Sequence, residues 1–342
     1  MFLTNYWYAA GWASEITSTP LARNILGRPI ALFRTEGGRL AAFDDCCPHR
    51  MAPLSFGSVV GETLQCGYHG LRFDCTGKCV EIPGQASIPP RATVRAYPMV
   101  ERWKFAWIWM GEPAAADPAT IPALTWLDDP EWDFSHGTVT YDCNHVLLCD
   151  NLMDLSHTTF THRRTIGTDD VARTGVTTKA TEESVLVERM MRNTEPSPFY
   201  KKIGGFTENV DRWQKIEYTP PTNVIIDAGA VPAGTNDRSR GIDTRIISMI
   251  TPETPTRTFQ FWAFARNFRV GDDALTRWIA DAIVLTFNED KAIIDAQQRN
   301  VTARPGQRML DHTADAGVVL MRKAMDRCLM RERADAGAGA AE

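Results

Sequence analysis

Two short segments of the first half of the chain, Cys47-Pro-His49 and Cys66-Gly-Tyr-His69, are separated by sixteen intervening residues. Each segment brings one thiol and one imidazole together, as expected for metal ligands on a tight loop. Cys46 lies beside Cys47, but only Cys47 has the Cys-x-His spacing. The two segments therefore predict a site with four protein ligands.

Two thiolates and two imidazoles fit two kinds of metal site. One is a tetrahedral structural zinc site. The other is a Rieske-type 2Fe-2S cluster, in which two imidazoles replace two thiolates on one iron. Zinc fingers keep their cysteines together and their histidines together, whereas each loop here supplies one of each, which favours the cluster. Cys75 and Cys79 have a metal-like spacing but no partner histidines, so we expect ordinary thiols there.

The residues around the two loops predict short antiparallel strands. Apolar runs at 29–34 and 40–44 flank a Thr-Glu-Gly-Gly-Arg segment that is typical of a hairpin turn. The pattern is repeated at 63–66 and 71–74, and an aromatic-rich run at 105–110 closes this half. The ligand loops are thus expected to lie in an all-β domain.

Prolines at 113, 118, 122 and 130 mark a change in composition after this half. We therefore expect an all-β domain at 1–112, a Pro-rich connection at 113–130 and a second domain at 131–333. The Ala/Gly-rich segment 334–342 predicts a disordered tail.

The whole composition is that of an ordinary globular protein, with 44% hydrophobic residues, 23% charged residues and a net charge of −5. The negative charge and the absence of a Lys/Arg run argue against nucleic-acid binding. No apolar run is long enough to span a bilayer, and the start does not resemble a signal peptide. Eight cysteines then suggest thiols or metal ligands in a cytoplasmic enzyme. No GxGxxG or GxxxxGK[ST] loop for a nucleotide is present.

The stretch Asn151-Leu-Met-Asp-Leu-Ser-His-Thr-Thr-Phe-Thr-His162 lies at the end of a predicted helix at 144–160. His157 and His162 are five residues apart, which turns the second ring by roughly 140° on a regular helix. Both rings can reach one metal only if the helix ends, loosens or bulges between them. The alternative is two unrelated histidines, one capping the helix and one exposed.

A carboxylate far along the chain could complete a metal site with these histidines. Strands are predicted at 184–192, 223–231, 245–251 and 258–267, and a long helix from Asp272 to about Asn300. On this helix Asp290 lies about 20° from Ile279, in the middle of an apolar stripe. A carboxylate there must be paired, for instance with an arginine, or bound to a metal. Two imidazoles and one carboxylate form the facial triad that non-heme iron uses with dioxygen.

These motifs together resemble the Rieske non-heme iron oxygenases. The resemblance rests on Cys-Pro-His-Arg50, Cys-x-Tyr-His-Gly70 and the pattern Asn-Leu-x-Asp-x-x-His-x-x-x-x-His that ends at His162. It implies an α+β fold, with an all-β Rieske domain followed by an antiparallel sheet covered by helices, of the helix-grip type. It also implies the ligands of both iron sites: Cys47 and Cys66 on one cluster iron, His49 and His69 on the other, and His157, His162 and Asp290 on a mononuclear Fe(II).

The same resemblance gives roles to Asp154 and Asn151, which share a helix side with His157. Asp154 would link His157 to the cluster histidine of a neighbouring subunit, equivalent to His69, in a ring-shaped homotrimer. Asn151 would support the iron ligands. A separate NAD(P)H-dependent reductase, of flavin or ferredoxin type, would supply electrons. A Rieske electron carrier without oxygenase activity and a zinc-stapled binding module remain the alternatives from other classes.

Further segments are shared with the group that contains vanillate O-demethylase, toluenesulfonate methyl-monooxygenase and dicamba O-demethylase: Asn5-Tyr-Trp-Tyr-Ala, Pro48-His-Arg-x-Ala-Pro-Leu54, Cys79-Val-Glu-Ile-Pro-Gly84, Trp107-Ile-Trp, Thr251-Pro-Glu-Thr and Ala265-Arg-Asn-Phe. This implies O₂-dependent hydroxylation of a methoxy carbon, with release of formaldehyde, or of a methyl carbon on a small aromatic acid such as vanillate or an aryl sulfonate.

The substrate is expected over the iron, between the sheet and the long helix. No arginine stands out as a partner for its acid group. The candidate wall residues, chosen because they lie on the predicted strands, are Asn223, Ile225, Ser248, Trp262 and Phe264.

Overall fold

The computed structural model describes residues 1–182, 184–235 and 237–339 and consists of two compact units. The first contains Met1–Ala123 and Thr251–Pro255, and the second contains Leu124–Ile250 and the residues from Thr256 onward. The boundary after Ala123 lies inside the predicted connection at 113–130. The return of 251–255 to the first unit is not visible in the sequence pattern.

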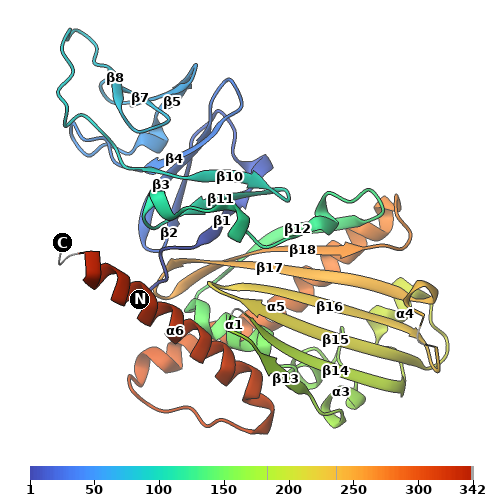
Figure 1. Ribbon diagram of the computed structural model, residues 1–342. Coiled ribbons are helices and arrows are strands. Elements are labelled where there is room, and N and C mark those ends of the chain that lie inside the picture. Colours follow the sequence, from blue (N-terminus) through green and yellow to red (C-terminus); the bar gives the residue numbers. More distant parts are fainter. Residues whose placement is uncertain (183, 236, 340–342) are drawn as a thin grey trace. The chain divides into compact units, whose positions relative to one another are not determined.

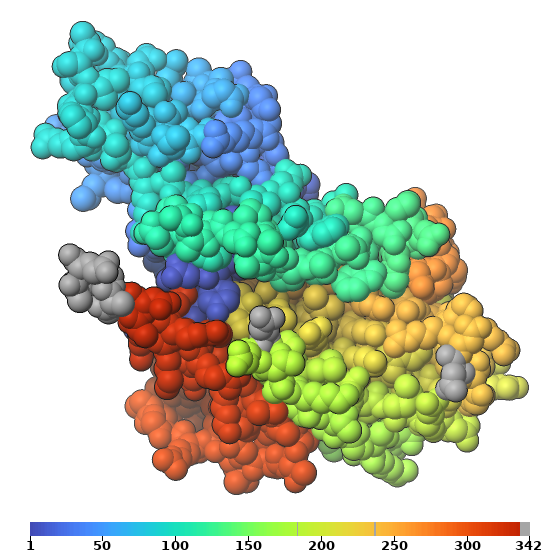
Figure 2. Space-filling view, viewed as in Figure 1, coloured from blue at the N-terminus to red at the C-terminus, as the bar shows by residue number. Residues whose placement is uncertain are grey.

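The first unit is built from three small sheets, with strand orders β1-β11-β10, β2-β3-β4-β9 and β5-β6-β7-β8. Neighbouring strands in these sheets pair antiparallel, as in β1–β11, β2–β3 and β5–β6. The β5–β8 sheet and its loops form one end of this unit (Figures 1 and 2). The strands are β1 Trp7–Trp12, β2 Leu21–Ile25, β3 Arg28–Arg34, β4 Leu40–Asp44, β5 Ser58–Val60, β6 Thr63–Gln65, β7 Arg72–Asp74, β8 Cys79–Glu81, β9 Ala96–Tyr97, β10 Met99–Arg102 and β11 Phe105–Trp109.

The position of strand β3 between two hydrophobic clusters explains why the strands of the first unit are nearly continuous apolar runs in the sequence. Ile30 and Leu32 pack in one hydrophobic cluster, whereas Ala31 and Phe33, on the opposite face, pack in a second. Successive side chains of a strand point to opposite faces, so a strand between two cores must be apolar at every position. The second cluster also contains Cys47 and Cys66, so the ligand loops are packed against the hydrophobic core of this unit.

The second unit is a seven-stranded antiparallel sheet, in the order β12-β18-β17-β16-β15-β14-β13, with helices packed against it (Figure 1). One hydrophobic core joins the sheet to helices α1, α4, α5 and α6. The strands are β12 Asp133–Tyr141, β13 Thr177–Ala180, β14 Val185–Thr194, β15 Val210–Thr219, β16 Asn223–Pro232, β17 Ile242–Thr254 and β18 Arg257–Arg266. The helices are α1 His145–Met153, α2 Thr158–Thr161, α3 Asp169–Arg173, α4 Pro198–Gly204, α5 Asp273–Ala303 and α6 Ala316–Gly339. The predicted α+β fold class is confirmed.

Side-chain caps fix where the two helices of the site begin. The Asn144 side chain accepts a hydrogen bond from Val146 N, and the Asp272 side chain accepts one from Leu275 N. Each cap satisfies a backbone N–H that has no partner within the helix. The start of α5 thus follows the cap predicted at Asp272.

Two predictions, one of a helix and one of a disordered tail, differ from the structure. The helix expected at 144–160 is interrupted, because Asp154 leaves α1 with φ −96° and ψ 107°. The tail expected at 334–342 continues α6 as far as Gly339, in keeping with the high helix propensity of alanine, and its last residues lie outside the described ranges. No helix among the described residues is long and apolar enough to cross a membrane.

Candidate metal centres

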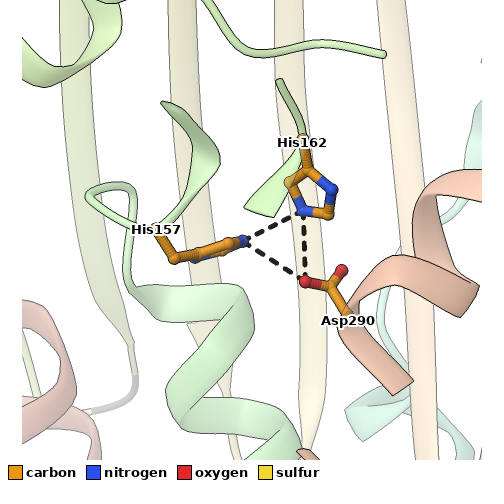
Figure 3. Close-up of side chains that lie close together, drawn as sticks. All are labelled: His157, His162 and Asp290. Atoms are coloured by element: carbon orange, nitrogen blue, oxygen red, sulfur yellow. Dashed lines mark hydrogen bonds and ion pairs between the residues drawn. The ribbon is translucent and has the colours of Figure 1, made fainter. Parts of the chain in front are cut away.

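His157 and His162 lie at the two ends of the single helical turn α2. His157 precedes this turn with helical angles, and His162 ends it with φ −106° and ψ 31°. The predicted distortion between the two histidines is thus found only at its end, where the helix stops at His162, because the turn itself is hydrogen-bonded as an ordinary helix. The break before His157 was not predicted. The imidazoles nevertheless meet, with their Nε2 atoms 3.2 Å apart (Figure 3).

Asp290 of α5 completes this group, as its position on the apolar stripe predicts. Its Oδ1 lies 3.1 Å from His162 Nε2 and 3.6 Å from His157 Nε2, and the residue is only 4% exposed. Among the described residues this is the one group of His, Cys, Asp or Glu that could surround a single ion, with ligand atoms within 4.8 Å of one another. Two imidazole nitrogens and one carboxylate oxygen fit the facial triad of non-heme iron.

The outer nitrogens of both rings have oxygen partners that orient the rings. His157 Nδ1 lies 2.6 Å from the main-chain oxygen of Asp154, and His162 Nδ1 lies 2.8 Å from Glu289 Oε2. Donation from Nδ1 leaves Nε2 of each neutral ring as the metal ligand. The donor set and both ring orientations therefore fit a bound iron.

The two histidines differ in their electrostatic environment. Burial lowers the pKa of His157 and outweighs the opposite effect of Asp290. Burial also opposes the charge of His162, but its contacts with Asp290 and Glu289 outweigh burial and raise its pKa. Glu289 thus provides a strong acceptor behind the second ligand.

Asn151 and Asp154 lie next to the triad in different ways. Asn151 Nδ2 donates to Asp290 Oδ1 at 3.1 Å, so Asn151 holds the carboxylate ligand. The Asp154 carboxylate accepts from Ser156 N at 2.7 Å, and its nearer oxygen to His157 Nδ1 is 3.9 Å away. The structure therefore corrects one expectation: the main-chain oxygen of Asp154, not its carboxylate, accepts from His157.

The two Cys/His loops of the first unit share one backbone design. Met51 N donates to Cys47 O at 2.9 Å, and Gly70 N donates to Cys66 O at 3.0 Å. Met51 and Gly70 close these turns with φ of +58° and +74°, the left-handed region, which glycine adopts at least cost. Each turn buries its cysteine and exposes its histidine.

The side chains of the two loops converge as a cluster requires. The rings of His49 and His69 lie with their centroids 4.4 Å apart, and Cys47 and Cys66 are both buried. Burial raises the pKa of the Cys47 thiol to about 11, so the thiolate form depends on a bound metal. The loops thus place a buried thiol pair behind an exposed imidazole pair.

A single zinc ion would need all four of these ligands within its coordination sphere. No group of three or more within this set has its ligand atoms within 4.8 Å of one another in the described chain. A cluster of two irons, with the cysteines on one and the histidines on the other, does not require that convergence. Cys75 and Cys79 lie apart from this arrangement, since their Sγ atoms face the carbonyl oxygens of Glu62 and Glu81.

The triad lines a cavity of about 110 Å³ within the second unit. Of the five predicted wall residues, only Phe264 lines it. Side chains alternate between the two faces of β16, and Ile226 faces the cavity. Asn223 and Ile225 are an odd number of residues from Ile226, so they occupy the other face. Ser248 lies two residues from the lining residue Ile246 and instead accepts a hydrogen bond from Gln260 Nε2. Trp262 lies two residues from the lining residue Phe264 and packs on Phe287.

The sequence interpretation also missed three polar residues of this site. Glu289 lies on the flank of the apolar stripe, next to Asp290. This position was the only feature in the sequence that could have indicated a role at the metal site. Arg212 and Gln214 line the cavity from β15, a strand whose polar alternation did not stand out in the sequence. Burial within the sheet thus distinguishes Arg212, which the sequence pattern alone did not indicate.

Comparison with known proteins agrees with both centres. Residues 6–98 match the Rieske 2Fe-2S domain family, and residues 141–331 match the vanillate O-demethylase oxygenase C-terminal domain family. The chain belongs to the Rieske oxygenases. The 2Fe-2S cluster and the mononuclear iron are thus the cofactors of this oxygenase, and the two alternatives, an electron carrier and a zinc module, are wrong.

The relatives of this Rieske oxygenase cover nearly its whole length. It is 38% identical over 341 residues to the toluene-4-sulfonate monooxygenase system iron-sulfur subunit TsaM1 of Comamonas testosteroni (97% of this chain, 98% of that protein). It is 38% identical over 347 residues to the vanillate O-demethylase oxygenase subunit of Pseudomonas sp. strain HR199 / DSM 7063 (99% and 98%). Dicamba monooxygenase bound to 3,6-dichlorosalicylic acid superposes with a TM-score of 0.91 at 35% identity (97% and 99%). These relatives are oxygenase components of multicomponent systems, which implies a separate reductase.

Proposed function

We propose that this oxygenase oxidises a methoxy or methyl carbon of a small aromatic acid, with O-demethylation as its main reaction. The cavity beside the triad carries this proposal. Its volume of about 110 Å³ is of the order of the roughly 150 Å³ cavity that holds benzene, which suits a single ring. Isoleucine and phenylalanine side chains dominate its walls, as expected for an aromatic substrate.

The residues of the chain would hold the reacting groups together and keep water out. His157, His162 and Asp290 supply three ligands and leave the remaining positions of the metal for other groups. The iron, when bound, supplies the activation of dioxygen. Apolar walls such as Ile226 and Phe264 exclude water from the reacting carbon. The reductase supplies two electrons, which with two protons and O₂ convert an aryl methyl ether to a phenol, formaldehyde and water.

Hydroxylation of the methyl group of an aryl sulfonate is the second candidate. The observation that favours it is the 38% identity to the toluene-4-sulfonate monooxygenase subunit. The product would then be a stable benzylic alcohol, because no oxygen atom joins the oxidised carbon to the ring. The two reactions can therefore be told apart by their products.

The test is turnover of a substrate panel by the iron-loaded enzyme with a reductase and NADH. We expect methoxybenzoates to release one formaldehyde per O₂ consumed, and toluene-4-sulfonate to give the alcohol without formaldehyde. Without the reductase no product should form. Failure of every methoxy- and methyl-substituted aryl acid, with both metal sites loaded, would contradict the proposed substrate class.

We further propose that the enzyme is a homotrimer in which Asp154 receives electrons from the cluster of a neighbouring chain. The side chain of Asp154 is partly exposed at the triad, and the nearby Phe160 is 71% exposed, which would suit coverage by a second subunit. His69, whose ring is also exposed, would be the cluster-side partner of this carboxylate. We place the enzyme in the cytoplasm, where its cysteines, none of which is in a disulfide in the described chain, would remain reduced.

Complementation between two inactive variants tests this arrangement. Chains with His69→Ala lose the cluster, and chains with Asp290→Ala lose the iron. Co-assembled trimers should recover part of the activity, because an intact cluster of one chain then neighbours an intact iron of another. Light scattering should give three times the chain mass of 38.2 kDa. Co-assembled trimers without activity would contradict transfer between subunits.

A further inference from the structure

Two buried arginines lie on neighbouring strands of the sheet behind the iron cavity. Arg189 of β14 is 5% exposed, and Arg212 of β15 is 3% exposed. Within the described part of the chain, neither guanidinium forms an ion pair with a carboxylate, and the Nη1 atom of each donates to a main-chain oxygen instead. An unpaired buried cation is costly, so its presence calls for a compensating negative group.

Arg212 is held in place, but its hydrogen-bonding capacity is not used up. Its guanidinium lies over the Tyr200 ring at 4.5 Å, and Nη1 donates to Ile166 O at 3.1 Å. Nε is buried without a hydrogen-bond partner among the described residues. A guanidinium can offer donors in a planar fork that matches the two oxygens of a carboxylate. Arg212 therefore has both the position and the free donor for an acid group.

Gln214 lies two residues along the same strand and lines the same cavity. Its Oε1 is also buried without a donor in the described structure. Gln214 pairs directly across the sheet with Arg189, whose Nε is likewise without an acceptor. Two of these unsatisfied groups, on Arg212 and Gln214, line the cavity, and the third, on Arg189, lies on the neighbouring strand outside the lining. Buried polar groups are normally hydrogen-bonded.

We propose that Arg212 binds the acid group of the substrate, with the side-chain amide N–H of Gln214 as a second donor, so that this end of the cavity selects aryl carboxylates or sulfonates. The inference rests on the proposed function and names the group that determines its specificity. Arg212 is the only lysine or arginine among the described residues that line the cavity. The other charged or titratable lining groups are His157, His162 and Asp290 of the iron site, the neighbouring Asp154, and Tyr200, whose ring packs on Arg212.

The second arginine strengthens the positive potential without lining the cavity. Burial and the charge of the neighbouring Arg212 lower the pKa of Arg189 to about 10. Asp154 partly offsets this repulsion. A bound anion beside Arg212 would relieve it further, whereas a neutral ligand of the same shape would not.

A purely structural role is the competing explanation for both arginines. Arg212 Nη1 donates to the main-chain oxygen of Ile166, which follows the iron ligand His162 in the chain. Arg189 Nη1 donates at 3.1 Å to the main-chain oxygen of Leu155, which precedes the iron ligand His157. Each arginine could simply hold a loop that carries an iron ligand. Such a role predicts equal loss of affinity for charged and neutral ligands, and loss of iron.

The experiment compares acid and neutral ligands of nearly equal shape on the anaerobic iron-loaded enzyme. Calorimetry gives Kd for 4-methoxybenzoate and 4-methoxybenzamide, and for toluene-4-sulfonate and toluene-4-sulfonamide. In Arg212→Met we expect Kd of the acids to rise at least tenfold and Kd of the amides to change less than twofold, with iron content unchanged. Arg212→Lys should recover part of the carboxylate affinity, and Gln214→Leu should cause a smaller, acid-selective loss.

Two control variants separate charge recognition from support of the loops. Arg192→Met removes a mostly exposed arginine of β14 that does not line the cavity, and it should leave both ligand types unaffected. Arg189→Met should reduce iron retention and affect acids and amides more equally than Arg212→Met.

Three outcomes overturn the inference: unchanged acid affinity in Arg212→Met, equal loss for acids and amides, or a wild type that binds neither acid. If the enzyme released formaldehyde from a neutral methoxyarene but not from any methoxy acid, the proposed oxygenase reaction would remain valid and recognition of the acid group would be overturned. Acid binding that depends on Arg212 without oxidation of any acid would instead contradict the proposed function and leave this site in place.

Discussion

Glu289 accepts the Nδ1–H of His162, with 2.8 Å between Nδ1 and Oε2, and lies directly before the iron ligand Asp290 on α5. Thr165 Oγ1 donates to the same oxygen at 3.0 Å. Two consecutive residues of one helix therefore serve one metal site, the first by orienting a ligand and the second by being a ligand. Partners of this kind fix the tautomer of a metal-bound histidine and increase its basicity.

Replacing Glu289 with Gln should lower iron affinity by about 10- to 100-fold, because a neutral amide is a weaker acceptor for His162. The measurement is the iron retained after dialysis against graded concentrations of a chelator. The visible spectrum of the Rieske cluster should not change. Asn288→Ala, at the exposed neighbouring position, is the control. Equal iron retention in Glu289→Gln and wild type would show that the contact does not support the metal.

Replacing Asp290 with Ala should remove the mononuclear iron and leave the cluster. The change deletes the only carboxylate of the triad, while Cys47, His49, Cys66 and His69 are untouched. Iron analysis should fall from three to two atoms per chain, with acid-labile sulfide and the visible spectrum unchanged. A variant that still holds three irons would mean that another group supplies the third ligand.

The iron ligands could be predicted because each depends on local spacing or helical period. Asp290 stands out since a helix brings it onto the same face as Ile279 and Ile283, both buried in the core. The Cys/His loops are short, and the presence of one cysteine and one histidine in each loop itself favours a Rieske cluster over a zinc finger. Predicted strands in the first unit, such as the one at 40–44, agree with β4 because hairpin turns border them.

Other parts of the site depend on tertiary structure that no local pattern records. Helix α1 ends at Met153 although the Asp154–His157 segment contains no proline or glycine, so no stop signal was visible in the sequence. The wall prediction failed at Ile225 because a phase error of one residue moves a side chain to the other face of a strand. Arg212 was missed because a charged residue in a strand is normally solvent-facing, and only its burial sets it apart.

Replacing Asp154 with Asn should abolish turnover while both metal sites stay loaded. The main-chain oxygen that accepts from His157 is unchanged, and an amide oxygen can still accept from Ser156 N. Only the charge that would couple the iron to the cluster is removed. The measurement combines product formation with stopped-flow reoxidation of the reduced cluster by O₂ in the presence of substrate, which should become at least 100-fold slower. Reoxidation at the wild-type rate would contradict the coupling role.

Acid should destabilise the fold through His145 in the first turn of α1. Burial lowers the pKa of this imidazole from 6.5 to about 4, so between these values the unfolded state binds more protons than the folded state. Stability is therefore fully present above pH 6.5 and is lost as pH falls toward 4, by about 2 kcal/mol at pH 5 relative to pH 8. Urea unfolding at the two pH values should show a smaller pH dependence in His145→Gln than in wild type. The same difference in both proteins would show that other groups control acid stability.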